Sequence, residues 1–365
     1  MARSRKRLLV VLAVPVLLAG CVQPPPLDVH LTWREVTPAG VVPAALAPSE
    51  SGLVVAGTDM SDSAPSVVLA TGETVPLVPS EPYAASARIV SATSAGGQLY
   101  LIGGRAGGAH ANTRWTIWDG PATGPVTSRP QEFFTFGGED AGPLLGTVIV
   151  DGRPIIVGSR GGTAGPDGAL YAADGEVWHQ LDTPDALHSA NGVVLGFAAV
   201  AAVGSTVVVA GDSVQATEAG AVQTPALYYG TVGGDWRRLD LPVQPGTTGL
   251  RHATGIACEG TTCWVAGWAQ HPIVWQVSLA NGVVGQTTIL TGDKPADQDP
   301  TALVAIVEGR PLVLTNASTP SAAVSCGDGW TSVAAPAQAI AVVGLGADAY
   351  VVAGDRLWRA TLPAC

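Results

Sequence analysis

The sequence predicts an all-β fold, and within that class a single β-propeller of seven four-stranded blades. Three observations support this prediction: a strand-like segment recurs along the chain, further strand types follow it in a constant order, and the composition disfavours long helices. The 365 residues include 46 glycines and 28 prolines, and only 13% of residues are charged. So many breakers fit short strands joined by turns. The low charge argues against disorder, and the single long apolar stretch argues against a polytopic membrane protein.

The recurring segment consists of three apolar residues, a small residue and a glycine. Its clear copies are residues 53–57, 100–104, 154–158, 207–211, 263–267 and 350–354, and a degenerate copy is residues 311–315. Successive copies end between 39 and 56 residues apart. Propeller blades repeat at about 40–50 residues, so each copy is expected to mark one blade of four short strands.

Two further strand types follow these copies. The first carries aromatic or apolar residues, and the second begins with tryptophan and leads to a proline. The first type occupies residues 114–118, 169–171, 226–229 and 273–275, and the second occupies residues 178–181, 236–239 and 330–333. Turn-forming pairs such as Asp174-Gly175 separate them. A strand rich in alanine and valine, such as residues 196–203, precedes each glycine-ended one, and its small residues suit the crowded axis.

The two ends of the chain are expected to meet in one blade. The last repeat stops after residues 356–362, which match the third strand type. The missing fourth type is found near the other end, where Trp33 opens the segment that leads to Pro38. We therefore expect residues 30–36 to lie antiparallel beside residues 356–362, because a closed ring removes exposed sheet edges.

Two turn sequences point to a known family. Residues 172–178 and 325–330 each place Asp-Gly before a tryptophan, which resembles the turn of Asp-box (BNR) and sialidase-type propellers. The resemblance covers most of residues 29–365 as an architecture. It implies the propeller fold and does not imply an activity.

The N-terminal residues 1–20 have the features of a signal peptide. A basic run precedes the apolar stretch 8–19, which is too short to span a bilayer. Residues 18–21 (Leu-Ala-Gly-Cys) resemble the bacterial lipobox, which implies cleavage before Cys21 and attachment of diacylglycerol to its thiol. The alternative is an ordinary secretory leader with a cysteine by chance. Residues 21–28 then form a proline-rich tether, and residues 29–365 form the propeller.

The mature chain is strongly acidic. Four of the 18 basic residues lie in the leader, so 14 basic residues remain against 29 acidic ones, a net charge near −15. Such a surface repels phosphate backbones and anionic lipids, so we expect no nucleic acid partner. Attachment to the membrane then requires the lipid anchor, which places the protein on the extracytoplasmic face of the cell membrane.

Four cysteines remain beside Cys21, and an even number in an exported protein predicts disulfides. Three connectivities are possible. We favour Cys258–Cys263, which brackets a hairpin loop, together with Cys326–Cys365, which would tie the C-terminus to a neighbouring blade. The alternatives are buried free thiols and a metal site, the second disfavoured because no histidine has zinc-motif spacing to these cysteines.

No catalytic, cofactor or metal motif is recognisable, so we expect a binding or scaffolding module for an envelope protein or glycan. The alternatives are a sialidase-like hydrolase and an assembly factor for envelope complexes. Propellers bind ligands on the loops that connect second to third strands and blade to blade. Our candidates on that face are Arg105, Arg160, Arg251, Trp268, Glu139 and Asp140. In the hydrolase alternative the arginines form the site, with Glu139 or Asp140 as the acid. A solvated rim of mixed charge is the simpler explanation of these residues.

Overall fold

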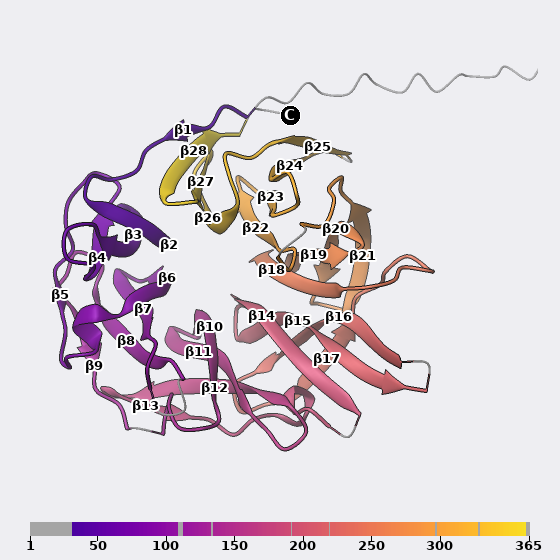
Figure 1. Ribbon diagram of the computed structural model, residues 1–365, viewed down its shortest axis with the longest axis horizontal. Coiled ribbons are helices and arrows are strands. Elements are labelled where there is room, and N and C mark those ends of the chain that lie inside the picture. Colours follow the sequence, from indigo (N-terminus) through magenta and orange to yellow (C-terminus); the bar gives the residue numbers. More distant parts are fainter. Residues whose placement is uncertain are drawn as a thin grey trace, which may run out of the picture.

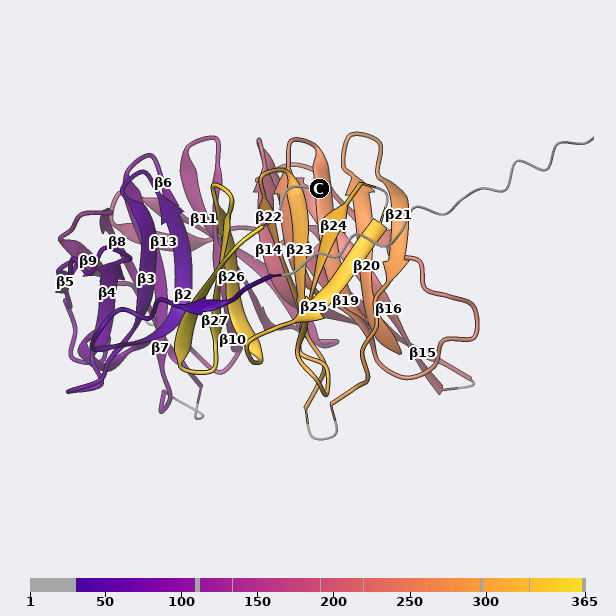
Figure 2. The same cartoon turned by 90° about the horizontal axis from the view of Figure 1, so that it is seen from above.

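The computed structural model describes residues 31–362 except 109–111, 133, 191, 219, 296–297 and 328. Within these residues the strands form seven sheets arranged as a ring, which confirms the seven-bladed propeller (Figure 1). Seen from the side, the blades stand next to one another around the central axis (Figure 2). No helix in the described part of the chain is long and apolar enough to cross a membrane. Cys21 and the leader lie outside the described residues.

Each blade takes its strands in chain order from the axis outward. The first strands are β2 (Val41–Ser49), β6 (Arg88–Ala95), β10 (Ala141–Val150), β14 (Val193–Val203), β18 (Arg251–Glu259), β22 (Ala302–Val307) and β26 (Ala339–Leu345). The second strands are β3 (Gly52–Asp59), β7 (Gln98–Arg105), β11 (Arg153–Gly161), β15 (Thr206–Thr217), β19 (Thr262–Ala269), β23 (Arg310–Thr315) and β27 (Asp348–Ala353). We number the blades 1 to 7 by their first strands, β2 to β26. All seven copies of the recurring segment therefore belong to second strands, as their common pattern predicted.

The outer strands complete the sheets. The third strands are β4 (Pro65–Leu69), β8 (Arg114–Pro121), β12 (Pro166–Asp174), β16 (Gly220–Thr231), β20 (His271–Ser278), β24 (Ser321–Cys326) and β28 (Arg356–Thr361). The fourth strands are β1 (Arg34–Glu35), β5 (Leu77–Val78), β9 (Val126–Arg129), β13 (Val177–Gln180), β17 (Trp236–Asp240), β21 (Val283–Ile289) and β25 (Gly329–Ala334). Two short 3-10 helices, η1 (Ala84–Ser86) and η3 (Asp185–Leu187), lie between blades.

The glycine of the recurring segment has a structural cause. In four copies it pairs with the residue at a β-bulge in the first strand of its blade, as where Gly211 pairs with Phe197 and the register shifts before Ala199. A Cβ atom at Gly211 would overlap the carbonyl oxygen of Gly196, and one at Gly57 would overlap that of Val42. At these two positions the bulge brings the backbones so close that only glycine fits, whereas in blade 7 Ala353 lies opposite the bulge. The degenerate copy ends in threonine, and its strand pair β22–β23 runs without a register shift.

Blade 7 contains strands from both ends of the described chain. Its sheet has the order β1-β28-β27-β26, with Arg34 opposite Arg359 and Glu35 opposite Trp358 in antiparallel register. The strand is shorter than the predicted segment 30–36, because it contains only two residues. The preceding Trp33 donates a hydrogen bond from Nε1 to the carbonyl of Ala334 in blade 6, at 2.9 Å.

Blades 1 and 2 share their outer strands unequally. Blade 1 has three strands, whereas the sheet of blade 2 has five because β5 pairs in parallel with β9. Residues 73–75 begin a fourth strand beside β4, where Val75 N donates to Val67 O at 2.9 Å. Pro76 follows, lacks an amide hydrogen and ends the pairing. The chain then crosses to the edge of blade 2.

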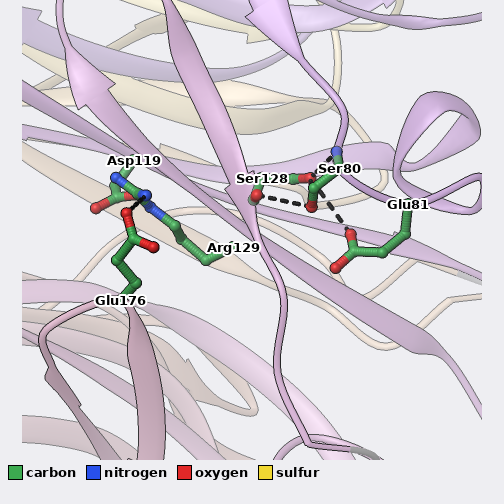
Figure 3. A network of polar contacts seen from close by, with 6 residues as sticks. All are labelled: Ser80, Glu81, Asp119, Ser128, Arg129 and Glu176. Atoms are coloured by element: carbon green, nitrogen blue, oxygen red, sulfur yellow. Dashed lines mark hydrogen bonds and ion pairs between the residues drawn. The ribbon is translucent and has the colours of Figure 1, made fainter.

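Polar contacts hold this crossover in place (Figure 3). Ser80 N donates to Ser128 Oγ at 2.7 Å, and Ser128 Oγ donates to Glu81 Oε2 at 3.3 Å. On the other side of β9, Arg129 pairs with Asp119 of its own blade and with Glu176 of blade 3, the latter at 2.6 Å. These contacts therefore join the crossover segment to the outer edge of blade 2, and blade 2 to blade 3.

One predicted disulfide is confirmed. Cys258 and Cys263 are bonded across the β18–β19 hairpin, with their Cα atoms 4.0 Å apart. They are direct partners in the antiparallel register, as the hairpin loop between them predicted. The second predicted pair, Cys326–Cys365, lies outside the described residues because Cys365 does.

Candidate functional site

The loops that connect second to third strands and blade to blade form one face of the ring, the lower side in Figure 2, which we call the loop face. Arg105 ends β7 in blade 2, and Arg160 lies near the end of β11 in blade 3. Glu139 and Asp140 immediately precede β10 and are exposed. Arg251 begins β18 in blade 5, two blades from Arg160.

The three predicted arginines have separate local partners. Arg105 Nη1 donates to Ser86 Oγ at 2.6 Å. Arg160 Nη1 donates to the carbonyls of Phe134 and Thr135 at 3.2 and 3.3 Å. Arg251 donates to the carbonyl of Thr247. The structure therefore holds each guanidinium against its own loop, and the three do not share one anion site.

Trp268 corrects an expectation. Its position in the sequence suggested an exposed loop, but it lies inside β19 and is only 1% exposed. Strand β19 continues to Ala269 and pairs with His271–Ser278, so Trp268 belongs to the sheet of blade 5 and not to a loop. A ligand on the loop face cannot reach it.

A pocket of about 90 Å³ opens on the loop face between blade 2 and the loop that leads to blade 3. Its aromatic walls are Tyr83, Trp115 and Phe136. The remaining lining residues are Gly108, Asn112, Thr113, Arg114, Gln131, Glu132, Gly137 and Gly138. Convergent aromatic and polar side chains at a junction between structural units are the usual composition of a binding site.

Side chains from both blades hold the loop that forms one wall of the pocket. Gln131 Nε2 donates to the carbonyl of Trp115 at 2.8 Å, and Asn112 Nδ2 donates to that of Gly138 at 2.9 Å. The ring of Phe136 lies 4.6 Å from the ring of Tyr171 in blade 3, centroid to centroid. The pocket is therefore preformed, and little ordering is required when a ligand enters.

The electrostatics of the rim depend on Arg114. Its guanidinium lies 5.9 Å from the centre of the Tyr83 ring, within cation–π range. Burial raises the pKa of the Tyr83 hydroxyl, nearby Glu81 raises it further, and Arg114 opposes both. Tyr83 therefore stays neutral at physiological pH and presents an aromatic face. Glu132 and Arg114 are both exposed, so the rim carries both signs of charge.

None of the six residues proposed from the sequence lines this pocket: Arg105 is only the register partner of Arg114, and Tyr83, Arg114 and Trp115 were missed. Arg114 and Trp115 were assigned to strand packing, because they belong to the third-strand pattern. The hairpin register contained a usable signal, since a strand ending at Arg105 and one starting at Arg114 place two like charges together. Tyr83 had no signal of its own.

One serine, one histidine and one aspartate meet near η3 without the geometry of a catalytic triad. His188 Nδ1 lies 2.9 Å from Asp167 Oδ2, but its Nε2 faces the carbonyl of Thr183 at 3.2 Å. Ser189 Oγ donates to the carbonyl of Pro166 at 2.5 Å and is buried. The hydroxyl hydrogen is thus committed to the backbone, and the imidazole is not its base. In the described part of the chain, no three His, Cys, Asp or Glu side chains group so as to hold a metal ion.

The chain matches no protein-family model, and it has no significant match among curated proteins. Several solved structures resemble it in fold. A chain of the mitotic checkpoint complex is 11% identical with a TM-score of 0.50, over 98% of this chain and 100% of that one. YCF48 from Cyanidioschyzon merolae is 13% identical with a TM-score of 0.53, over 91% and 98%. A gluconolactonase from Xanthomonas campestris is 11% identical with a TM-score of 0.44, over 91% and 90%. At identities this low, the two structures with TM-scores of 0.50 and 0.53 show the fold alone.

Proposed function

We propose that this protein is a lipid-anchored, extracytoplasmic propeller that binds a protein of the cell envelope through the loop face of blades 2 and 3. The observation that supports this best is the preformed pocket between blade 2 and the loop that leads to blade 3, with its aromatic walls and charged rim. The propeller fold is consistent with a binding or scaffolding module, since its rigid ring positions loops without taking part in chemistry itself.

The anchor is argued from the leader. A lipidated Cys21 would carry two or three acyl chains, and each buried methylene contributes about 0.8 kcal/mol to membrane binding. The acidic body has no attraction of its own to anionic lipid. The tether of residues 21–28 would then separate the propeller from the membrane and leave the loop face open to a partner.

A protein partner is favoured over a substrate. The pocket is well below the roughly 300–1,000 Å³ of sites that enclose a drug-sized ligand. The groups that converge on it are an arginine, a tyrosine, a glutamate and amides, and Glu132 is the only carboxylate among its lining residues within the described chain. Glycoside hydrolysis ordinarily requires two carboxylates about the scissile bond.

Site-specific photocrosslinking in cells tests this proposal. A photoreactive amino acid is placed at Glu132, which is exposed and lines the pocket, and as a control at Asn281, which is exposed on the opposite face. We expect a discrete protein adduct from position 132 and none from position 281. Adducts of equal yield from both positions, or none from position 132, contradict the proposal. Turnover of a glycoside by the purified protein, lost in both Arg105→Ala and Arg160→Ala, would favour the hydrolase instead.

A further inference from the structure

Two arginines face each other at the edge of the pocket. Arg105 is the last residue of β7 and Arg114 is the first residue of β8, and they are direct partners in the antiparallel register. Like charges directly opposite one another destabilise a sheet. Both side chains are exposed, and neither forms an ion pair with any described residue. Arg105 contacts only a serine hydroxyl and Arg114 only an aromatic face in the contacts found for them.

The two arginines lack ion pairs although the chain is rich in carboxylates. Acidic residues outnumber basic ones by 29 to 14 in the mature protein. Four other arginines, Arg129, Arg238, Arg356 and Arg359, each contact an aspartate or glutamate, whereas Arg160 and Arg251 donate to backbone carbonyls. A third arginine, Arg88, begins the neighbouring strand β6 opposite Gly104 at the same end of blade 2. The end of this blade therefore gathers three arginines on an acidic molecule, beside the glutamates of the pocket rim.

The volume and the aromatic walls of the pocket beside these arginines limit which side chain can enter it. At about 90 Å³ with walls of Tyr83, Trp115 and Phe136, it accepts a single apolar side chain. Glu132 lies in the lining and, like the nearby Glu139, is exposed. A bound carboxylate is repelled by these glutamates and attracted by the two arginines, so it has to lie on the arginine side of the pocket.

We infer that the partner presents an extended acidic peptide segment, in which one apolar side chain enters the pocket and an adjacent carboxylate pairs with Arg105 and Arg114. This inference rests on the proposed function, because it names the chemistry of the partner at the same face. The acidic body disfavours a nucleic acid or an anionic membrane at these arginines, since such polyanions meet many carboxylates at once. A short segment with one or two acidic residues meets mainly the arginines.

Binding of short peptides to the purified mature propeller tests the inference. The probes are three capped, fluorescein-labelled pentapeptides: Ser-Glu-Leu-Glu-Ser, Ser-Lys-Leu-Lys-Ser and Ser-Glu-Ser-Glu-Ser. Fluorescence polarisation at low ionic strength measures their affinities. We expect the first to bind about tenfold more tightly than either of the others, because it alone offers both the carboxylate and the apolar side chain. Added salt should weaken its binding.

Variants separate the two contacts. Arg105→Gln with Arg114→Gln should abolish the preference for the acidic over the basic peptide, whereas Arg237→Gln, an exposed arginine on the outer strand β17, should leave it unchanged. Tyr83→Ala should remove the preference for leucine over serine, and Tyr83→Phe should retain it because the ring remains.

Several outcomes would overturn the inference: equal affinity for acidic and basic peptides, no effect of the arginine substitutions, or no binding of the first peptide up to about 1 mM. The crosslinking result distinguishes this failure from failure of the proposed function. An adduct at position 132 together with unselective peptides would show that the face binds a protein of different chemistry. Absence of the adduct would count against the proposed function itself.

Discussion

Glu35 accepts a hydrogen bond from Arg356 Nη1 at 2.6 Å, although 321 residues separate them in the chain. The contact joins β1 to β28 and brings the two ends of the described chain together in blade 7. Both side chains are exposed, so the ion pair contributes little stability. Burial and backbone pairing have to hold this closure, in particular the packing of Trp33 against the core of blades 6 and 7 and its hydrogen bond to Ala334.

Trp33→Ala should therefore destabilise the propeller by about 2 kcal/mol, since a half-buried indole and its hydrogen bond are lost together. Glu35→Gln is the matched surface control and should leave the free energy of unfolding unchanged. Urea unfolding of the soluble mature domain measures both. Equal effects of the two substitutions would mean that packing of Trp33 is not what closes the ring.

Gly211→Ala should destabilise the protein by about 2–3 kcal/mol, because the added Cβ overlaps the backbone of β14 at its bulge. Gly285→Ala in β21 provides the control, since the nearest heavy atom to a Cβ there is 3.8 Å away. We expect that variant to be neutral or slightly more stable. Chemical denaturation compares them, and an equally mild effect at position 211 would refute the close-approach explanation.

Cys21→Ala should release the protein from membranes, because the acidic body has no other affinity for lipid. The measurement is fractionation of cells followed by immunoblotting, with a high-salt wash to remove proteins held by charge. Replacing the nearby Gln23 with Ala keeps the thiol and serves as the control. Retention of the Cys21→Ala protein in the washed membranes would contradict lipid anchoring.

Peptide mapping under non-reducing conditions should recover the Cys258–Cys263 bridge and a second bridge between Cys326 and Cys365. The first closes a short loop, so the double variant Cys258→Ala with Cys263→Ala should lose only about 2 kcal/mol and remain folded. Thermal unfolding with and without reductant checks the stability. Four alkylatable thiols in the exported protein would exclude both bridges.

Because of His252, the free energy of unfolding should decrease as the pH is lowered. Burial lowers the pKa of this imidazole, although the carbonyl of Pro300, Asp212 and Asp299 oppose that shift and Lys294 adds to it. The folded protein therefore binds a proton less readily than the unfolded chain. The stability from neutral His252 is complete above the unfolded pKa, near 6.5, and is lost as pH falls toward the lower folded value.

The test is to measure the unfolding free energy of wild type and His252→Gln between about pH 7.5 and 5. The wild type should lose more stability than the variant over this range, by at most about 1.4 kcal/mol per pH unit for one proton. His271→Gln is a control at an exposed histidine. Parallel curves for wild type and His252→Gln would rule out this linkage.

The sequence alone determined the strands and their order, because these are local properties. A run of apolar residues ending in glycine marked six of the second strands and a degenerate copy marked β23, and tryptophan followed by proline marked β13, β17 and β25. The same logic found the Cys258–Cys263 hairpin, since five residues separate the two positions and a short loop fixes their register. Counting such units was enough to predict seven blades.

The tertiary structure decided whatever depends on how blades meet. The break at Pro76 was visible in the sequence, but only packing decides that β5 then pairs with β9 of the next blade. Trp268 lies in a strand rather than a loop because β19 extends two residues past the recurring glycine, and its side chain is buried there. The pocket likewise needs three segments, around Tyr83, Trp115 and Phe136, that no local pattern connects. Side-chain neighbours across blades are set by the geometry of the closed ring, and a one-dimensional pattern does not contain that geometry.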